Sequence, residues 1–324
     1  MGMLVDGRWV DRWYDTSATG GHFQRQESRF RDRVTADGSS GFRAEAGRYH
    51  LYVSLACPWA HRTLIYRELK RLGDAIPISI VNPLMAEKGW TFDEDPALGT
   101  RVIPDPVLGA RALHEIYTAA DPTYTGRVTV PVLWDRERRT IVNNESAEII
   151  RMLDVEFDAF GDPDVRFCPD HLRDEIDAIN ARVYADVNNG VYRCGFATTQ
   201  DAYEEAYLAL FAALDWLEER LSGRRWLVGG RITEADWRLF TTLVRFDAVY
   251  VGHFKCNQRR IADFPNLSGY LRDLYQVPGV AGTVSIEHIK RHYFASHRQI
   301  NPTGIVPLGP RLDLAAPHDR TRLD

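Results

Sequence analysis

Residues 49–72 join a β-type run to a helical run through a cysteine that is followed directly by a proline. The run YHLYV at residues 49–53 is typical of a short strand, and residues 58–72 carry leucine and isoleucine at helical spacing. Pro58 suits the first turn of that helix, because the amide proton that proline lacks would have no intrahelical partner there. The pattern predicts a strand that runs into Cys57 and a helix that begins just after it.

Cys57 lies where the predicted helix begins, and this position favours the ionised thiol. A helix N-terminus carries partial positive charge, which stabilises a thiolate relative to a thiol. Ala60 stands where a CxxC motif has its second cysteine. A mixed disulfide formed at Cys57 must therefore be resolved by an external thiol such as glutathione. An ordinary buried cysteine before a helix is the alternative that the Cys-Pro pair alone leaves open.

The order of elements around this motif predicts a small α/β domain. The length of 324 residues favours two domains. Strand and helix signals alternate over residues 47–157, with a second strand at 76–81, a helix at about 112–120, a hairpin of 130–134 with 140–142, and a closing helix at 145–157. This order is typical of a small sheet with helices on both faces.

Residues 169–297 are expected to form an all-helical domain. An apolar stripe recurs at helical spacing from Tyr207 to Leu221, and Thr233 with Asp236 predicts a capping box. Residues 1–46 are polar, glycine-rich and aromatic in patches, so we expect an ordered N-terminal extension with few regular elements. Residues 298–324 are rich in proline and should form an extended C-terminal tail.

Composition argues against several classes of protein. The net charge of −5, with acidic and basic residues interleaved, gives no reason to expect nucleic acid or an anionic membrane surface. No apolar run approaches the roughly 18 residues of a membrane helix, and the N-terminus has no secretory signal. The four cysteines form no CxxC pair, so we expect neither a zinc site nor a disulfide framework, and we expect a reducing cytoplasm. His288 and His292 have metal-ligand spacing, but no third ligand is evident, so no metal site is predicted.

Two further segments have features of a site for a peptide-like ligand. Pro131 opens a predicted strand, and a cis bond to Val130 would turn the Val130 backbone outward, where it could pair with an extended ligand. The turn NNES at residues 143–146 leads into a helix. Its amides and the Ser146 hydroxyl could hold a carboxylate, and Glu145 could pair with an ammonium group. An edge-strand proline and plain helix capping are the alternatives for these segments taken singly.

In this order and spacing, the three segments resemble the glutathione transferase architecture, in which an α/β thioredoxin-like domain precedes an all-α domain. More narrowly, the chain resembles the glutathionyl-hydroquinone reductases, also called the Xi class, over nearly its full length. The resemblance implies a thioredoxin-like, glutathione-binding domain at residues 47–157 and the helical domain at residues 169–297. The motifs that carry it are GRWV at 7–10, YVSLACPWAHRTLIYRELK at 52–70, Gly89-Trp90, NNES at 143–146, and YFASH at 293–297 followed by INP at 300–302.

The resemblance implies glutathione-dependent reduction of glutathionyl-hydroquinones to hydroquinones, with release of oxidised glutathione. Cys57 matches the nucleophile, which takes glutathione from the substrate as a mixed disulfide, and a second glutathione then frees the cysteine. Glutathione is thus a co-substrate and glutathionylated hydroquinones are partners, whereas no bound cofactor is implied. A homodimer is expected on the same grounds.

The resemblance also assigns roles to further residues. Tyr192 matches the proton donor, whereas Tyr250 and Tyr293 match tyrosines that face the second substrate and support the Cys57 thiolate. Phenols suit this work, because cleavage of a carbon–sulfur bond leaves charge on the ring that a donor must neutralise. Core packing is the alternative for any single tyrosine. The positions that match glutathione contacts are Trp90, Arg127, Val128, Thr129, Val130, Glu145 and Ser146.

Two other functions remain open from the sequence. One is an omega-like thiol transferase that acts on protein mixed disulfides or dehydroascorbate, and the other is a non-catalytic module that binds glutathione or a partner. Cys57 together with three tyrosines argues against a binding module. A second site lined by tyrosine favours quinone-derived substrates over ascorbate.

Overall fold

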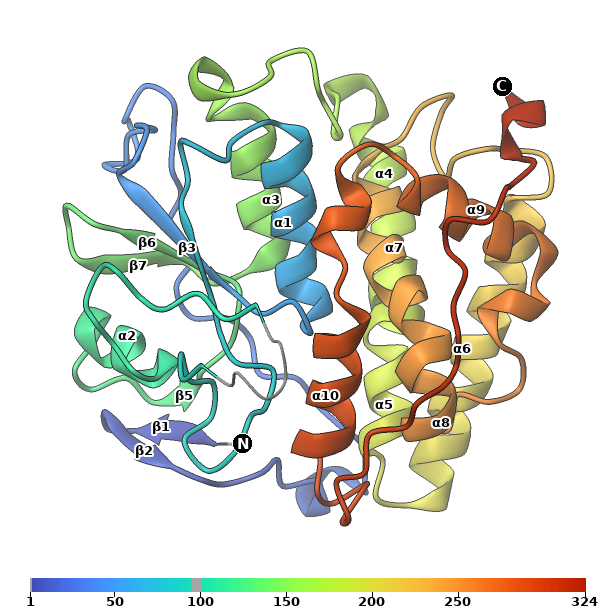
Figure 1. Ribbon diagram of the computed structural model, residues 1–324, viewed down its shortest axis with the longest axis horizontal. Helices are drawn as coiled ribbons and strands as arrows, with labels where there is room; N and C mark the ends of the chain where they lie inside the picture. Colours follow the sequence, from blue (N-terminus) through green and yellow to red (C-terminus); the bar gives the residue numbers. More distant parts are fainter. Residues whose placement is uncertain (1, 95–100) are drawn as a thin grey trace. The chain divides into compact units, whose positions relative to one another are not determined.

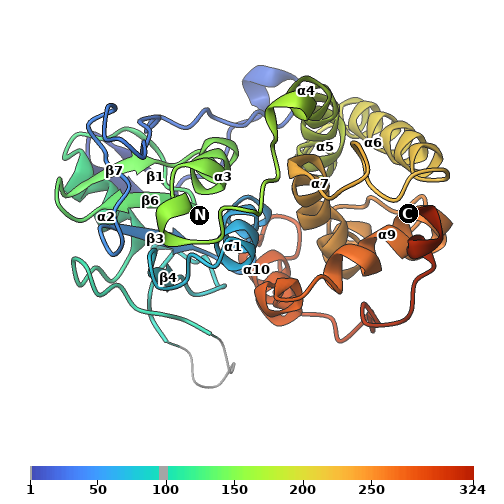
Figure 2. The same ribbon diagram turned by 90° about the horizontal axis from the view of Figure 1, so that it is seen from above.

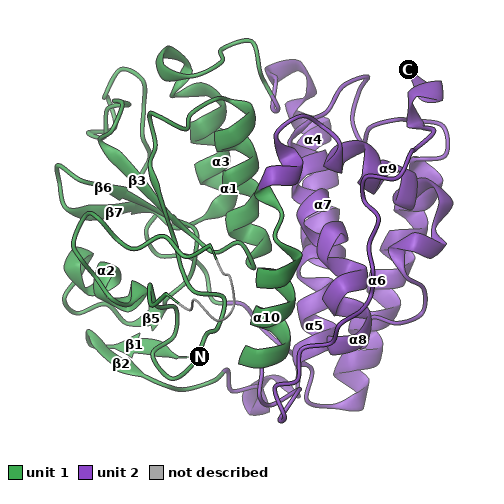
Figure 3. Ribbon diagram, viewed as in Figure 1, with its two compact units in different colours: residues 1–13, 26–166, 283–296 green, residues 14–25, 167–282, 297–324 purple. Residues whose placement is uncertain are grey.

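The computed structural model describes residues 2–94 and 101–324. The chain divides into two compact units (Figure 3). Unit 1 consists of residues 1–13, 26–166 and 283–296, and unit 2 consists of residues 14–25, 167–282 and 297–324. Each unit is therefore assembled from segments that lie far apart in the sequence.

Unit 1 is built on a four-stranded mixed sheet with the order β4-β3-β6-β7. β3 and β4 are parallel, with Leu51 opposite Ile78, whereas β6 is antiparallel to both β3 and β7. Every residue of β3 is buried, so the strand that leads toward Cys57 lies in the core. The strands span Tyr49–Val53 (β3), Ile78–Ile80 (β4), Val132–Asp135 (β6) and Thr140–Asn143 (β7).

Helices cover both faces of this sheet, as the sequence predicts. α1 and α3 lie side by side on one face, and α2 lies on the other (Figures 1 and 2). A further helix, α10, comes from near the C-terminus and belongs to the same unit. The bounds are Pro58–Leu69 (α1), Leu113–Ala120 (α2), Ser146–Val155 (α3) and Ile286–Ser296 (α10).

A second, three-stranded sheet in unit 1 was not predicted. β1 (Met3–Val5) pairs antiparallel with both β2 (Arg8–Val10) and β5 (Gly126–Arg127). Strands of two or three residues are too short to show a periodic pattern, and β5 lies far along the chain from β1. The sequence therefore indicated order in the N-terminal extension but did not reveal that it adds strands to unit 1.

Unit 2 contains helices α4 to α9. The predicted capping box is present at the start of α7, where the Thr233 N–H donates to Asp236 Oδ2 at 2.7 Å. Every residue of α7 is buried, which makes it the central helix of the unit. The bounds are Arg173–Arg182 (α4), Gly190–Phe196 (α5), Gln200–Arg220 (α6), Glu234–Arg245 (α7), Val251–His253 (α8) and Pro265–Tyr275 (α9).

Two π-helical segments interrupt the helices of unit 2. One spans Val183–Asn188 and leads into α5, and the other spans Phe246–Tyr250 and leads into α8. Asn188 fixes the first segment to α7, because its Nδ2 donates to Arg238 O at 3.1 Å and to Thr242 Oγ1 at 2.7 Å. π-Helical turns are rare and concentrate at functional sites, so these two segments mark the region of Tyr192 and Tyr250.

In the part of the chain that the structure describes, no helix is both long and apolar enough to span a membrane. No cluster of three or more His, Cys, Asp or Glu side chains in the same residues has the arrangement of a metal site. The two histidines with metal-ligand spacing make structural contacts in unit 1. His288 Nε2 accepts from the Arg101 N–H at 3.0 Å, and His292 Nδ1 lies 3.0 Å from Pro83 O.

Candidate active site

Cys57 caps the N-terminus of α1. Its backbone is extended (φ −79°, ψ 123°), and Pro58 occupies the first helical position. The thiol is partly exposed, and its Sγ lies 3.5 Å from Val130 O. The side chain is thus held between the positive end of a helix and the loop before β6, where a thiolate is stabilised and an incoming sulfur can reach it.

The loop before β6 offers a backbone amide beside the thiol. The Val130–Pro131 bond is cis, as the sequence suggested. Within residues 2–94 and 101–324, the Val130 N–H has no hydrogen-bond partner, although the residue is buried. A buried amide without a partner costs free energy unless a ligand or water accepts its proton. Val130 can therefore donate to a peptide-like ligand next to Cys57.

The turn before α3 is arranged for an anionic group. Glu145 is the N-cap, and its Oε1 accepts from the Ala147 N–H at 3.1 Å. Its Oε2 accepts from Ser28 Oγ at 3.2 Å, so the carboxylate is fixed in place and retains acceptor capacity. The Ser146 N–H, at the first position of the helix, has no partner among the residues described. An N–H group at this position is a natural donor to a carboxylate.

One buried phenol joins these two segments. The Tyr117 hydroxyl donates to Thr129 O at 2.8 Å and accepts from Asn144 Nδ2 at 3.1 Å. Burial raises the pKa of Tyr117, which keeps the phenol protonated and able to donate. Tyr117 therefore sets the spacing between the loop that ends at Val130 and the turn that leads to Ser146.

Arg62 is a site residue that the sequence analysis missed. Its guanidinium is buried in α1 and donates from Nη1 to Ser146 Oγ at 3.3 Å. The same group lies over the Trp59 ring, 4.6 Å from its centroid. The bond leaves the Ser146 hydroxyl proton available for a ligand, because the oxygen is the acceptor. The CPWAHR string contains this arginine, but only the fold shows that it reaches the start of α3.

Trp90 and Tyr293 are both in unit 1 and are linked through His292. The Trp90 indole stacks on the His292 ring at a centroid distance of 4.7 Å, and His292 meets the Tyr293 ring edge-on at 5.2 Å. All three side chains are buried. The Ser296 Oγ accepts from the Met85 N–H at 2.9 Å, which ties the end of α10 to the loop that leads to Trp90.

Arg127 contacts the N-terminal segment on both sides of the β1–β2 pair. Its Nη1 donates to Arg12 O at 2.6 Å and to Gly2 O at 3.3 Å, and its N–H donates to Gln26 Oε1 at 3.2 Å. These hydrogen bonds tie Arg127 to the N-terminal segment. Val128 and Thr129 link this residue to Val130, and Val128 is buried.

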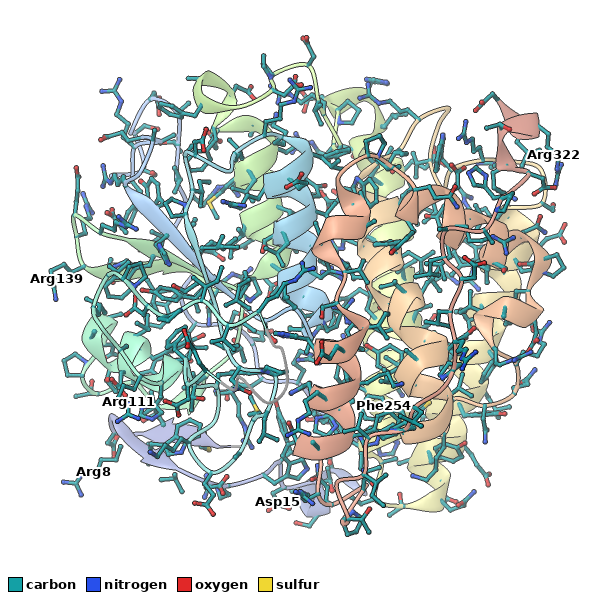
Figure 4. All side chains as sticks on the ribbon, viewed as in Figure 1. Arg8, Asp15, Arg111, Arg139, Phe254 and Arg322 are labelled. Carbon is teal, nitrogen blue, oxygen red and sulfur yellow. The ribbon has the colours of Figure 1, made fainter. Side chains whose placement is uncertain are left out.

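Tyr192 and Tyr250 lie together in unit 2. Their ring centroids are 6.2 Å apart, and each lies 5.5 Å from the ring of Phe254. Tyr192 lies in α5, whereas Tyr250 ends the second π-helical segment and is fully buried. Phe254 directly follows α8 and is labelled in the lower part of Figure 4. The two tyrosines thus form one aromatic cluster, whereas Tyr293 belongs to the unit that holds Cys57.

A histidine pair borders this aromatic cluster. His253 Nε2 and His297 Nδ1 are 3.1 Å apart, and the His297 ring stacks on Phe254 at 5.9 Å. Burial, with a smaller effect of Lys255, lowers the pKa of His253 to about 4. The His253 ring is therefore uncharged at neutral pH.

Two family models match the chain. They describe the glutathione S-transferase N-terminal domain, over residues 56–156, and the glutathione S-transferase C-terminal domain, over residues 200–273. The glutathionyl-hydroquinone reductase PcpF of Sphingobium chlorophenolicum is 59% identical over 310 residues, which are 96% of each chain. The glutathionyl-hydroquinone reductase YqjG of Escherichia coli is 56% identical over 99% of this chain and 98% of that one.

Solved structures agree with this relationship. The glutathione-bound structure of YqjG from Escherichia coli matches with a TM-score of 0.90 and 51% identity, over 99% of both chains. A Xi class glutathione transferase from Natrialba magadii matches with a TM-score of 0.92 and 49% identity, over 100% of this chain and 97% of that one.

Proposed function

The chain belongs to the glutathionyl-hydroquinone reductases of the glutathione transferase family, and from this we propose that it reduces glutathionyl-hydroquinones to hydroquinones with Cys57 as the nucleophile. The observation that carries the role of Cys57 is its place at the N-terminus of α1, with Sγ beside Val130. Glutathione is the co-substrate, in keeping with the glutathione-bound structure of a relative at 51% identity.

The reaction has two sulfur transfers. The Cys57 thiolate attacks the sulfur of the glutathionyl group, a sulfur–sulfur bond forms, and the carbon–sulfur bond breaks with its electron pair left on the aromatic carbon. A proton from Tyr192 converts that carbon to a carbon–hydrogen bond and gives the hydroquinone. A second glutathione thiol then loses its proton, which restores the Tyr192 phenol, and its thiolate attacks the mixed disulfide, releases oxidised glutathione and restores the Cys57 thiolate.

Glutathione binding rests on unit 1. The Val130 N–H is available to the peptide backbone of glutathione, and the Ser146 N–H and hydroxyl are available to its γ-glutamyl carboxylate. Glu145 provides the negative charge for the α-ammonium group. Trp90 is a further contact by resemblance. For Arg127 we propose an indirect contribution, through its hold on the N-terminal strand beside Val128 and Thr129.

The three tyrosines serve the hydroquinone half of the substrate. Tyr192 is the proton donor, and Tyr250 and Tyr293 stabilise negative charge on the sulfur and on the ring oxygens. The aromatic surroundings of Tyr192 support this assignment, because Phe254 and Tyr250 give the apolar surface that a quinone-derived ring requires. We further propose, from the family resemblance, a cytoplasmic homodimer. The four cysteines are present as thiols, which fits a reducing compartment.

A substrate panel tests the proposed function. Turnover of glutathionyl-menadiol, a glutathionylated peptide and dehydroascorbate is measured with the same preparation and the same glutathione concentration. We expect glutathionyl-menadiol to give the highest kcat/KM. A preference for the peptide or for dehydroascorbate would replace the reductase with the omega-like thiol transferase, and binding without turnover would indicate a binding module.

A further inference from the structure

The N-terminal segment of residues 14–25 places an arginine on the ring of Tyr192. The guanidinium carbon Cζ of Arg25 lies 4.9 Å from the Tyr192 ring centroid. The Nε of Arg25 donates to Asn189 Oδ1 at 3.1 Å, which fixes the guanidinium relative to the start of α5. These distances place a full positive charge over the face of the proposed proton donor, within the range of cation–π contacts.

The segment that carries Arg25 is tied to unit 2 at several points. The Thr199 hydroxyl donates to Gly20 O at 2.9 Å, and the Thr198 N–H donates to Gly21 O at 3.1 Å. Gly21 has φ +90°, and a Cβ there would lie 2.4 Å from Thr199 Oγ1, so only glycine fits this approach. Phe23 packs on Phe196 at 5.2 Å. Arg25 is therefore held by the fold.

The neighbours of Tyr192 make this charge effective. The uncharged rings around it belong to Phe23, Phe196 and Phe254. Its ionisable neighbours in the described residues include Arg25 and the phenol of Tyr250. Tyr192 is only 9% exposed and Arg25 is half-buried, so water screens their interaction only in part.

The reaction leaves Tyr192 as a phenolate when its proton moves to the aromatic carbon. An anionic ring is attracted by a cation over its face more strongly than a neutral phenol is. We infer that Arg25 is a positioning residue that stabilises the phenolate of Tyr192 and so strengthens Tyr192 as the acid of the hydroquinone step. This inference rests on the proposed function of Tyr192, and it assigns Arg25 no contact with the substrate.

The two asparagines that precede Gly190 make different contacts. Asn188 is buried against α7, whereas the side-chain oxygen of Asn189 accepts a hydrogen bond from Arg25. The polar turn before Tyr192 thus fixes both the backbone of the acid and the cation that acts on it.

The test compares Arg25→Gln, Arg25→Lys and a matched control, Arg193→Gln. Arg193 is adjacent to Tyr192 in the sequence, but its guanidinium pairs with Glu205 at 2.6 Å, so this control removes a nearby positive charge that has another partner. The chain has 14 tyrosines, so the ionisation of Tyr192 is followed with a single ring fluorine at that position, by fluorine NMR over a pH titration. Thermal unfolding of each variant checks the fold.

We expect Arg25→Gln to move the ionisation midpoint of Tyr192 upward by about one pH unit, and to lower kcat for glutathionyl-menadiol by about five- to thirtyfold. Arg25→Lys, which keeps the charge but not the planar group, should fall between Arg25→Gln and the parent protein. Arg193→Gln should leave the midpoint in place. In a Tyr192→Phe background, Arg25→Gln should cause no further loss of glutathionyl-menadiol turnover.

The outcomes separate this inference from the proposed function. An unchanged Tyr192 midpoint in Arg25→Gln overturns the inference, whatever happens to turnover. The same is true if Arg193→Gln moves the midpoint as far as Arg25→Gln does. A shifted midpoint together with a fully active Tyr192→Phe enzyme removes Tyr192 from the reaction, which overturns the proposed acid but leaves its electrostatic coupling to Arg25 demonstrated. If Arg25→Gln fails to fold, the Arg25→Lys midpoint decides, and no shift there overturns the inference.

Discussion

The surroundings of Cys57 and those of Tyr192 differ in kind. Beside Cys57 lies the backbone of Val130, and the same unit presents the N–H groups of Val130 and Ser146 and the guanidinium of Arg62. Around Tyr192 the structure presents aromatic rings and the Arg25 guanidinium. The region of Cys57 suits the peptide backbone of glutathione, which takes part in both proposed sulfur transfers. The region of Tyr192 suits the aromatic ring of the hydroquinone, which takes part only in the first. We therefore expect that substitutions near Cys57 change glutathione recognition, whereas substitutions near Tyr192 change substrate choice.

The thiols of the two regions show the same contrast. Cys57 lies at the N-terminus of α1 and is partly exposed. Cys256 lies after the C-terminal end of α8 and is fully buried, and its N–H donates to Tyr250 O at 3.0 Å. Burial, and then the neighbouring Cys194, raise the pKa of Cys256 well above its usual range. The surroundings of Cys57 therefore favour a thiolate, whereas those of Cys256 oppose one.

The largest expected effect is that of Cys57→Ser. This change should reduce turnover of glutathionyl-menadiol and of a glutathionylated peptide to background, because serine forms no mixed disulfide. Glutathione binding, measured by calorimetry, should persist, since it rests on Val130, Glu145 and Ser146. Residual conjugating activity is also expected, because a hydroxyl can stabilise a bound glutathione thiolate.

Cys256→Ala is the matched control for Cys57→Ser. It removes a thiol from the aromatic region and should keep turnover close to that of the parent protein, with a modest loss in the free energy of unfolding from the small cavity. Full turnover in Cys57→Ser would show that Cys57 is not the nucleophile. Loss of turnover in Cys256→Ala would point to Cys256 instead.

Tyr192→Phe should have the next largest effect, and only on one substrate. The change removes one hydroxyl with little change of volume, and general acid catalysis typically contributes about 100- to 10,000-fold. Turnover of glutathionyl-menadiol should fall by that range. Reduction of a glutathionylated peptide should change by less than about tenfold, because its leaving group is a thiolate that needs no acid.

Both rates for Tyr192→Phe are measured on one preparation, which controls for loss of fold. Equal losses on the two substrates would mean that Tyr192 supports the Cys57 thiolate or the structure. Its region would then have no separate role in the hydroquinone step. No loss on either would take Tyr192 out of the site.

Alkylation rates measure the contrast between the thiols directly. In the folded protein at neutral pH, Cys57 should react more than about tenfold faster than Cys168, Cys194 or Cys256, because each pH unit that separates two thiol ionisations changes the thiolate fraction tenfold. Peptide mapping of the labelled sites checks the order. A Cys57 rate whose pH midpoint lies at or above the roughly 8.5 of a free cysteine would contradict the role assigned to the α1 N-terminus.

The smallest expected effect is that of Tyr117→Phe. The change removes the hydrogen bonds that tie Thr129 and Asn144 to one phenol. A neutral hydrogen bond contributes about 1 kcal/mol, so KM for glutathione should rise by roughly five- to tenfold while kcat changes less. Tyr124→Phe is the control, because the Tyr124 ring packs against that of Tyr117 and its hydroxyl donates to Arg127 O at 3.2 Å. An equal rise of KM in the control would argue against a specific role for Tyr117.

The sequence predicted the elements of unit 1 that have a strong local pattern. β3, α1, α2, α3 and the β6–β7 hairpin all lie close to their expected positions, because each has its own periodicity or turn residues. β1, β2 and β5 were missed, since strands so short are defined only by their partners. The π-helical segments were also missed, because an apolar pattern does not distinguish a π-turn from an α-turn.

The residues of the candidate site likewise fall into those with a local sequence signal and those without one. Cys57, Val130 and Glu145 could be proposed because the residue type and its place at the end of an element already indicate the chemistry. Arg62 and Arg25 could not, because each acts on a residue that is distant along the chain, Ser146 and Tyr192 respectively. Arginines are common in this sequence, so no local signal separates these two from the rest.

The π-helical segments bear on how such a protein can diverge. A π-turn holds one more residue than the α-helical turn it replaces, and one residue corresponds to about 100° of rotation around a helix axis. Loss of a single codon within Val183–Asn188 would restore an ordinary helix, and the later side chains of α5, Tyr192 included, would keep their directions. One residue can therefore be gained or lost in this segment without re-aiming Tyr192, whereas the same change in an ordinary α-helix would rotate everything after it.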